Sequence, residues 1–213
     1  HERKGIEIKK AIMDSTKELG LSNRAKSFAT SCIDTLISSE SKIHGIPIDS
    51  VHFHEASSID TLVDIVGIAI AMDDLDLFDE EIICMPIAVG GGHVKFSHGT
   101  MSNPASAILE ILKNSKLLIH GGYVKEELTT PTGASIIVNL SKTSSDYYPS
   151  MEIESIGYGA GKKNFEEFSN VLKIVKGTQR NEFQLDRVKI LETNVDDISG
   201  EILGNLIEKI MSK

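Results

Sequence analysis

The pattern of apolar and polar positions predicts a chain in which helices alternate with short strands. Apolar residues recur at helical spacing in six segments, which are residues 6–19, 22–42, 59–75, 105–112, 134–140 and 200–211. Ser22 is the predicted cap of the second helix, and Pro104 is predicted to lie in the first turn of the fourth. The third segment is apolar on more than one face, so we expect this helix to be buried in the centre of its domain.

Short apolar stretches between the helices predict strands at residues 51–53, 82–89, 117–119, 151–156, 170–175 and 188–194. The fourth and fifth of these are expected to pair around a glycine-rich loop, Gly157 to Gly161. The alternation predicts an α/β fold, with α+β as the alternative, in which helices pack on a mixed sheet.

A polar stretch near the C-terminus predicts the domain organisation. Residues 178–186 are expected to link a main α/β domain, residues 1–177, to the start of a second small α+β domain, residues 187–213. One strand and one helix are too few to bury a core, so we expect this second domain to be truncated. The chain also begins without Met, which leads us to expect a fragment or a processed product.

Charge and cysteine content exclude several classes of protein. The 213 residues carry 31 acidic and 22 basic side chains, a formal charge of −9, which argues against nucleic acid as a partner. No apolar run approaches the roughly 20 residues of a membrane span, and the first residues do not form a signal peptide. Cys32 and Cys84 lie in apolar surroundings, so we expect buried free thiols and a cytoplasmic location.

The sharpest candidate for chemistry is a cluster of His52, His54 and Glu55 followed by Asp60 and Asp64. In an extended segment the two histidines point to the same side, and the two aspartates lie one helical turn apart. Imidazole and carboxylate ligands suit nickel, zinc or iron(II). The alternative is that the histidine and glutamate hydrogen-bond the helix start while the aspartates are solvated.

Three other segments have the composition of ligand-binding loops. Glycines 90–92 with His93 could approach a ligand closely, or could form a surface loop with an incidental histidine. Residues 129–133 precede a helix and form either an anion site or an ordinary cap. Residues 157–163 combine glycines with two lysines and could bind a phosphate, although a hairpin connection needs no ligand.

A final acidic segment, residues 192–197, ends in Asp196 and Asp197. These carboxylates could hold Mg²⁺ or Mn²⁺ beside a nucleotide, or could cap the helix that follows.

Seven segments together resemble the LarC-type nickel-insertion proteins, and they occur in the order found in that family. The matching segments are residues 44–47 (HGIP), 51–55 (VHFHE), 63–67 (VDIVG), 101–105 (MSNPA), 127–134 (ELTTPTGA), 156–162 (IGYGAGK) and 191–197 (LETNVDD). The resemblance implies a nickel chelatase, a lyase that inserts Ni²⁺ into pyridinium-3,5-bisthiocarboxylic acid mononucleotide. Its product is the nickel-pincer cofactor of lactate racemase-type enzymes.

The resemblance also implies CTP hydrolysis with Mn²⁺ or Mg²⁺ in the full-length family, a function associated with its C-terminal domain. From the resemblance we expect that this chain lacks the family's N-terminal strand before His1 and most of its C-terminal domain beyond Lys213. CTP use by this chain is therefore an open expectation, as is a homo-oligomeric state.

Residue roles are carried over only at motif positions. Nickel is expected at His52, His54, Glu55, Asp60 and Asp64, and the nucleotide's divalent ion at Asp196 and Asp197. The mononucleotide phosphate is expected at Thr130, Thr132, Gly159, Gly161 and Lys162. Forming the Ni–C bond requires a base for the pyridinium C4 proton, and His54 or His93 could serve. The competing functions are a non-catalytic nickel-binding or storage protein and a metal-dependent phosphohydrolase.

Overall fold

The computed structural model describes residues 3–53, 59–96, 99–122, 124–166, 168–179 and 199–211. The chain divides into two compact units, residues 1–148 and 149–213. The linker predicted at residues 178–186 and the strand predicted at 188–194 lie almost entirely outside the described residues, so the predicted domain bounds stay a prediction.

The described residues contain six α-helices, as the apolar spacing predicts. They are α1 Gly5–Glu18, α2 Asn23–His44, α3 Ile59–Asp74, α4 Ser106–Leu112, α5 Pro131–Leu140 and α6 Gly200–Met211. Two short 3₁₀ helices span Ile48–Ser50 and Leu77–Asp79. Ser22 caps α2 as predicted, because its hydroxyl oxygen accepts a hydrogen bond from the backbone N–H of Ala25 at 3.1 Å.

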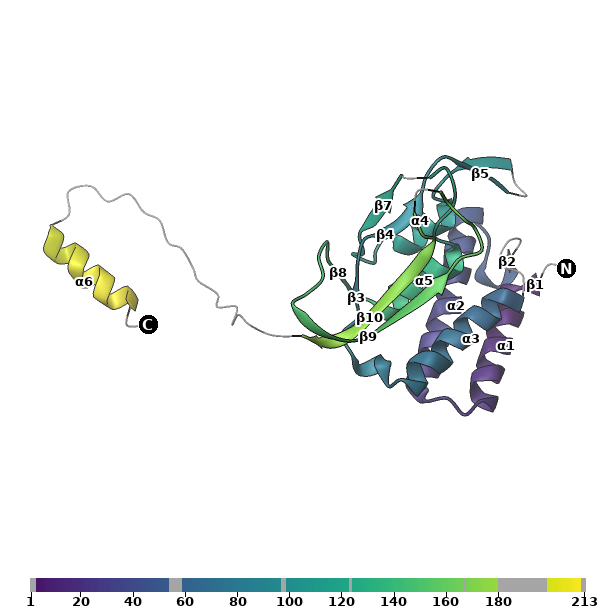
Figure 1. Ribbon diagram of the computed structural model, residues 1–213, viewed down its shortest axis with the longest axis horizontal. Coiled ribbons are helices and arrows are strands. Elements are labelled where there is room, and N and C mark those ends of the chain that lie inside the picture. Colours follow the sequence, from purple (N-terminus) through teal and green to yellow (C-terminus); the bar gives the residue numbers. More distant parts are fainter. Residues whose placement is uncertain are drawn as a thin grey trace. The chain divides into compact units, whose positions relative to one another are not determined.

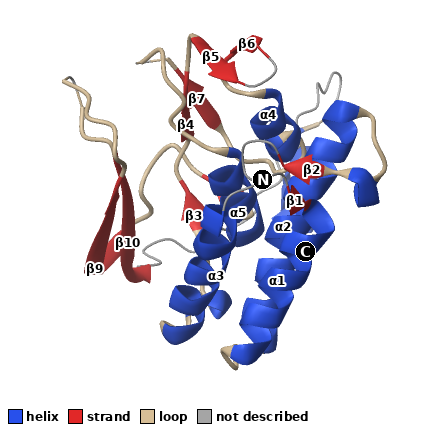
Figure 2. Cartoon of the chain, turned by 90° about the vertical axis from the view of Figure 1, so that its right-hand side faces the viewer, coloured by secondary structure: helices blue, strands red, loops and turns tan. Residues whose placement is uncertain are grey.

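The strands form five two-stranded sheets among the described residues. The strands are β1 Arg3–Lys4, β2 His52–Phe53, β3 Ile83–Cys84, β4 Ile87–Gly90, β5 His93–Phe96, β6 Gly99–Ser102, β7 Ile119–Gly121, β8 Thr143–Ser144, β9 Met151–Ala160 and β10 Val171–Gln179. The pairs β3–β8 and β4–β7 are parallel, whereas β1–β2, β5–β6 and β9–β10 are antiparallel. This mixture of parallel and antiparallel pairing with packed helices confirms the predicted α/β class (Figure 2).

Three local predictions were wrong. The strand expected at residues 82–89 is divided into β3 and β4 at Met85 and Pro86, because proline has no N–H to donate to a ladder. Pro104 precedes the cap residue Ala105 instead of lying in the first turn of α4. Two of the glycines expected in a loop from Gly157 to Gly161 belong to β9, in which Gly157 pairs with Ile174 and Gly159 with Leu172, while Gly161 follows the strand.

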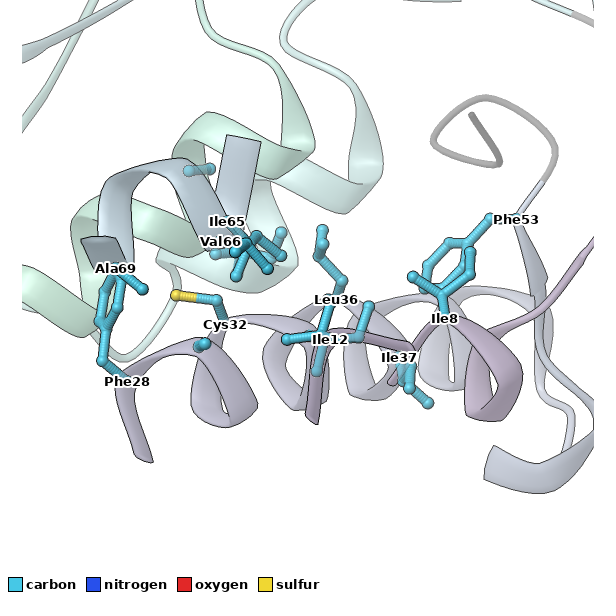
Figure 3. Close-up of a cluster of buried hydrophobic side chains, with 14 of the residues drawn as sticks. Ile8, Ile12, Phe28, Cys32, Leu36, Ile37, Phe53, Ile65, Val66 and Ala69 are labelled. Atoms are coloured by element: carbon cyan, nitrogen blue, oxygen red, sulfur yellow. The ribbon is translucent and has the colours of Figure 1, made fainter. Parts of the chain in front are cut away.

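The hydrophobic core of the first unit is built around α2, which packs against α1, α3, α4 and α5. Its buried face includes Cys32, Ile33 and Leu36. Figure 3 shows Cys32 and Leu36 beside Ile65 of α3. The prediction that the third helix is central was wrong, because Val63 and other apolar residues of α3 are exposed. The central position belongs to the longer α2, which presents buried residues from Ala25 to Ser39.

Burial has a direct effect on the two thiols. Cys32 is fully buried, and desolvation raises its pKa to about 12. Cys84 is half-buried, and desolvation also raises the pKa of its thiol, which donates a hydrogen bond to the carbonyl oxygen of Met85 at 3.1 Å. Both are free cysteines, as predicted.

The second unit contains the hairpin of β9 and β10, together with α6 (Figure 1). Apolar side chains on both faces of this hairpin are exposed, including Tyr158 on one face and Leu172 and Ile174 on the other. The ammonium of Lys173 lies 5.9 Å from the centre of the Tyr158 ring. None of the helices in the described ranges has the length and apolar character that crossing a lipid bilayer requires.

Candidate functional site

The candidate site begins where the parallel strands β4 and β7 end. Ala88 is in register with His120, and Gly90 with Gly121. The N–H of Gly122 donates to the carbonyl oxygen of Gly90 at 3.2 Å, so the strands stay joined to their last residues. The carboxyl ends of parallel strands are the edge at which α/β proteins bind their ligands.

A second segment passes very close to this edge. Gly90 has a φ of +76°, and a Cβ at this position would overlap the carbonyl oxygen of Glu126. Gly90 also forms an isolated antiparallel bridge with Glu127. Glycine is therefore required here both by its backbone conformation and by the approach of residues 126–127.

The same segment leads into α5 and fixes the start of that helix at the edge. The Thr129 hydroxyl donates to the carbonyl oxygen of Ala88 at 2.7 Å. Thr130 is the N-cap of α5, and its side-chain oxygen accepts a hydrogen bond from the N–H of Gly133 at 3.1 Å. The capping role of Thr130 is thus confirmed, and the positive end of the helix dipole lies beside the strand ends, where it favours an anion.

Thr132 joins α5 to α3. Its side chain is buried, and its hydroxyl oxygen lies 3.4 Å from the hydroxyl oxygen of Thr61. Thr61 is in the first turn of α3, next to Asp60. The first turns of the two helices are therefore in contact, which brings the acidic start of α3 next to the N-terminus of α5.

Three of the five predicted metal ligands are described: His52 on β2, and Asp60 and Asp64 on α3. The Nδ1 atom of His52 is 2.9 Å from the carbonyl oxygen of Ser50. A carbonyl oxygen can only accept, so Nδ1 carries the proton and leaves Nε2 as the free lone pair for a metal. Asp60 and Asp64 are exposed on one face of α3, and desolvation together with the charge of Asp60 raises the pKa of Asp64.

His54 and Glu55, the central residues of the predicted metal cluster, lie outside the described residues. Within the part of the chain that is described, no three histidine, cysteine or carboxylate side chains converge as metal ligands. His93 opens β5 directly after the glycines and is exposed. It pairs with Ser102 in the β5–β6 ladder, three residues beyond Gly90, the last residue of β4.

The remaining predicted residues belong to the second unit. Gly159 lies in β9, and Lys162 is exposed in the connection that follows. Gly161 donates its N–H to the carbonyl oxygen of Asn170 at 2.9 Å, which closes that connection. Asp196 and Asp197 lie outside the described residues.

Two residues at the edge were missed by sequence reasoning. His120 stands on β7, in register with Ala88, and is exposed. A histidine directly before Gly121 and Gly122 at the end of a short strand was a usable signal. Asn103 donates to three carbonyl groups around the strand end, and only its place within a family-like motif marked it in the sequence.

The fold defines an α/β protein in which the acidic start of α3 contacts the first turn of α5, beside the carboxyl ends of two parallel strands. The chain belongs to the nickel insertion protein family, whose model matches residues 1–213. It is 38% identical over 213 residues to the pyridinium-3,5-bisthiocarboxylic acid mononucleotide nickel insertion protein of Staphylococcus saprophyticus, covering 100% of this chain and 52% of that protein.

Archaeal relatives give a similar result. Identity is 38% over 200 residues to a protein of Methanothermobacter thermautotrophicus that carries the nickel insertion name, with 94% of this chain and 47% of that protein covered. Identity is 41% over 201 residues to the corresponding protein of Methanothrix thermoacetophila, and the match covers 94% of this chain and 50% of that protein. The chain thus spans about half the length of these curated relatives. No solved structure matches it.

Proposed function

We propose that this chain is part of a nickel chelatase that inserts Ni²⁺ into pyridinium-3,5-bisthiocarboxylic acid mononucleotide and so makes a nickel-pincer cofactor. Family membership and the name of the staphylococcal relative support this proposal. The structural observation that carries it is the contact between Thr61 and Thr132. Through this contact a segment with metal-type ligands adjoins a strand edge with the features of a nucleotide site.

In this proposal the start of α3 and the segment before it deliver the nickel. The neutral imidazole of His52 offers Nε2, while Asp60 and Asp64 supply carboxylate oxygens on one helical face. His54 and Glu55 complete the set. Such mixed nitrogen and oxygen ligands suit a metal that must be released to the sulfur atoms of the substrate, because thiolates bind nickel more strongly.

The strand edge would hold the mononucleotide. The N-terminus of α5 at Thr130 and Thr132 offers a positive dipole end to the phosphate. For Gly159, Gly161 and Lys162, which belong to the second unit, phosphate binding is a separate proposal. Nickel insertion also requires that a base remove the pyridinium C4 proton, whose bonding pair then forms the Ni–C bond. His54 or His93 would accept this proton as a neutral imidazole.

CTP with Mn²⁺ or Mg²⁺ belongs to the same proposal. Asp196 and Asp197 would hold the divalent ion beside the nucleotide, since hard cations prefer carboxylate oxygens. We place the reaction in the cytoplasm and leave a homo-oligomeric assembly open.

The test is to mix the protein with Ni²⁺ and the thiolated mononucleotide, with and without CTP and Mn²⁺, and to measure the mass of the small-molecule product. A nickel-bearing mononucleotide is the expected result. Tight nickel binding without product would instead favour a binding or storage role, and phosphate release without nickel insertion would favour a phosphohydrolase.

The nickel ligands are tested by isotherms of His52→Ala and His54→Ala. We expect each variant to bind nickel at least about tenfold more weakly, because loss of a ligand leaves a coordination position to water. His44→Ala is the matched control, since His44 lies at the end of α2 and pairs with Glu40 at 3.2 Å. Equal isotherms for all three variants would remove these histidines from the nickel site.

A further inference from the structure

The side-chain amide of Asn103 holds the two segments of the strand edge together. Its Nδ2 atom lies 3.0 Å from the carbonyl oxygen of Val89, 3.3 Å from that of Gly91 and 2.9 Å from that of Glu126. The first two belong to the end of β4, and the third belongs to the segment that leads into α5. Asn103 thus occupies the junction of the candidate mononucleotide site.

This arrangement fixes the orientation of the amide. Nδ2 is the only side-chain donor of asparagine, and a reversed amide would place Oδ1 against three carbonyl oxygens. Oδ1 therefore points away from these three carbonyl oxygens. This oxygen is buried, and only 9% of the residue is exposed. No group in the described chain donates a hydrogen bond to it.

A buried carbonyl oxygen without a donor is unfavourable, and native structures satisfy nearly all such groups. The missing partner must be a hydrogen-bond donor. The proposed substrate offers few donors, because its thiocarboxylates and its phosphate are ionised at pH 8 and its ring nitrogen is alkylated. The ribose hydroxyls are its donors.

We propose that Asn103 is a substrate-binding residue whose Oδ1 accepts a hydrogen bond from a ribose hydroxyl of the mononucleotide, while its Nδ2 holds the site together. This assignment rests on the proposed function. Oδ1 is buried in the structure, so the hydrogen bond to the ribose requires a local shift of the atoms around it. Asn103 then binds the ribose, whereas the N-terminus of α5 binds the phosphate.

The first test uses the unmodified protein. Calorimetry at pH 8 without nickel compares pyridinium-3,5-bisthiocarboxylic acid mononucleotide with its 2′-deoxy and 3′-deoxy forms. We expect one deoxy form to bind about three- to tenfold more weakly, the usual range for one hydrogen bond. Equal affinity for all three would overturn the assignment of Asn103 alone. Failure of the parent compound to bind would overturn the proposed function and this assignment with it.

The second test assigns the lost affinity to Asn103. In Asn103→Ala the parent and the weaker deoxy form should bind equally, whereas Asn139→Ala should keep the preference of the unmodified protein. Asn139 is a matched control because its Nδ2 also donates, at 2.8 Å to the carbonyl oxygen of Ser135 and at 3.0 Å to the Thr35 hydroxyl. A preference that persists in Asn103→Ala would contradict the proposal.

A third readout does not depend on whether Asn103→Ala folds. The ¹³Cγ resonance of Asn103 in the unmodified protein should shift when the parent mononucleotide binds, because a new hydrogen bond polarises the amide carbonyl. The shift should be smaller with the weaker deoxy form. An unchanged resonance at saturating mononucleotide would assign Oδ1 to water or internal packing and overturn the proposal.

Discussion

Apolar side chains are buried in the core around α2 but exposed on the β9–β10 hairpin. Ile33 on α2 has 0% of its surface exposed, whereas Leu172 on β10 has 68% exposed. Four helices surround α2, but a two-stranded hairpin has two open faces and is marginally stable by itself. Similar apolar content along the sequence therefore produces a closed core in one unit and an exposed surface in the other.

This difference indicates that the candidate site depends for its stability on the α2 core. The strand edge and the first turns of α3 and α5 belong to the first unit, and α3 and α5 both pack on α2. The α2 core therefore holds the proposed nickel and nucleotide segments in place. The hairpin carries Gly159 without a comparable core of its own in the described residues.

The largest expected effect on stability comes from truncating one apolar side chain to alanine in each region. Ile33→Ala should lower the free energy of unfolding by about 2–5 kcal/mol, because it leaves a cavity among packed side chains. Leu172→Ala should change it by less than about 0.5 kcal/mol. Urea unfolding followed by circular dichroism measures both values. Equal losses would show that the hairpin is as tightly packed as the core and would break the comparison.

A smaller effect is expected from adding one methyl group to a glycine in each region. Gly90→Ala should destabilise the first unit by about 1–3 kcal/mol, because φ is +76° and the new Cβ meets the carbonyl of Glu126. Gly157→Ala is the matched change in β9, where a Cβ has open space around it. It should be neutral or slightly stabilising. Thermal unfolding of both variants sharpens the comparison, and a tolerated alanine at position 90 would contradict the close approach.

The smallest effect concerns two aspartates on α3 whose pKa values move in opposite directions. Hydrogen bonds from Ser22 lower the pKa of Asp73 below its ordinary value of 3.8, so Asp73 adds stability above that pH and loses it as the pH falls through the lowered value. The raised pKa of Asp64 has the opposite sign: ionised Asp64 is unfavourable at neutral pH, and the penalty disappears on acidification.

These signs predict that Asp73→Asn is less stable than the parent chain at pH 7, whereas Asp64→Asn is slightly more stable. Both differences should vanish in strong acid, once the two carboxyls are protonated in the folded and the unfolded chain. Melting temperatures between pH 2 and 7 provide the measurement. A loss of stability in Asp64→Asn at pH 7 would contradict the raised pKa.

Periodicity predicted the helices well because each has a continuous apolar face and, in α2, a hydroxyl cap at Ser22. It failed where a single residue or a non-local partner decides the structure. Pro86 interrupts a run that reads as one strand, and the glycines of β9 are held in a ladder by apolar residues on β10. Pro86 is visible in the local sequence, whereas the ladder that holds the β9 glycines depends on a separate strand.

Individual residues of the candidate site were predicted from the sequence, but the contacts that bring its segments together were not. Thr130 was named with its capping role, and Asp60 and Asp64 were placed on one helical face. The contact between Thr61 and Thr132 joins residues 71 positions apart, and the Asn103 amide joins three separate carbonyls. Such long-range pairs depend on how the helices pack, which one sequence does not specify.

The burial of Cys32 has a consequence for metal selectivity. A thiol whose pKa is about 12 is protonated at neutral pH, and a protonated thiol is a poor ligand for Ni²⁺. Cys84 is also partly shielded and has a raised pKa. In a protein proposed to carry nickel to a sulfur-containing substrate, its own sulfur atoms would otherwise compete as trapping ligands. The core therefore leaves the thiocarboxylates of the substrate as the accessible thiolate-type ligands for the metal.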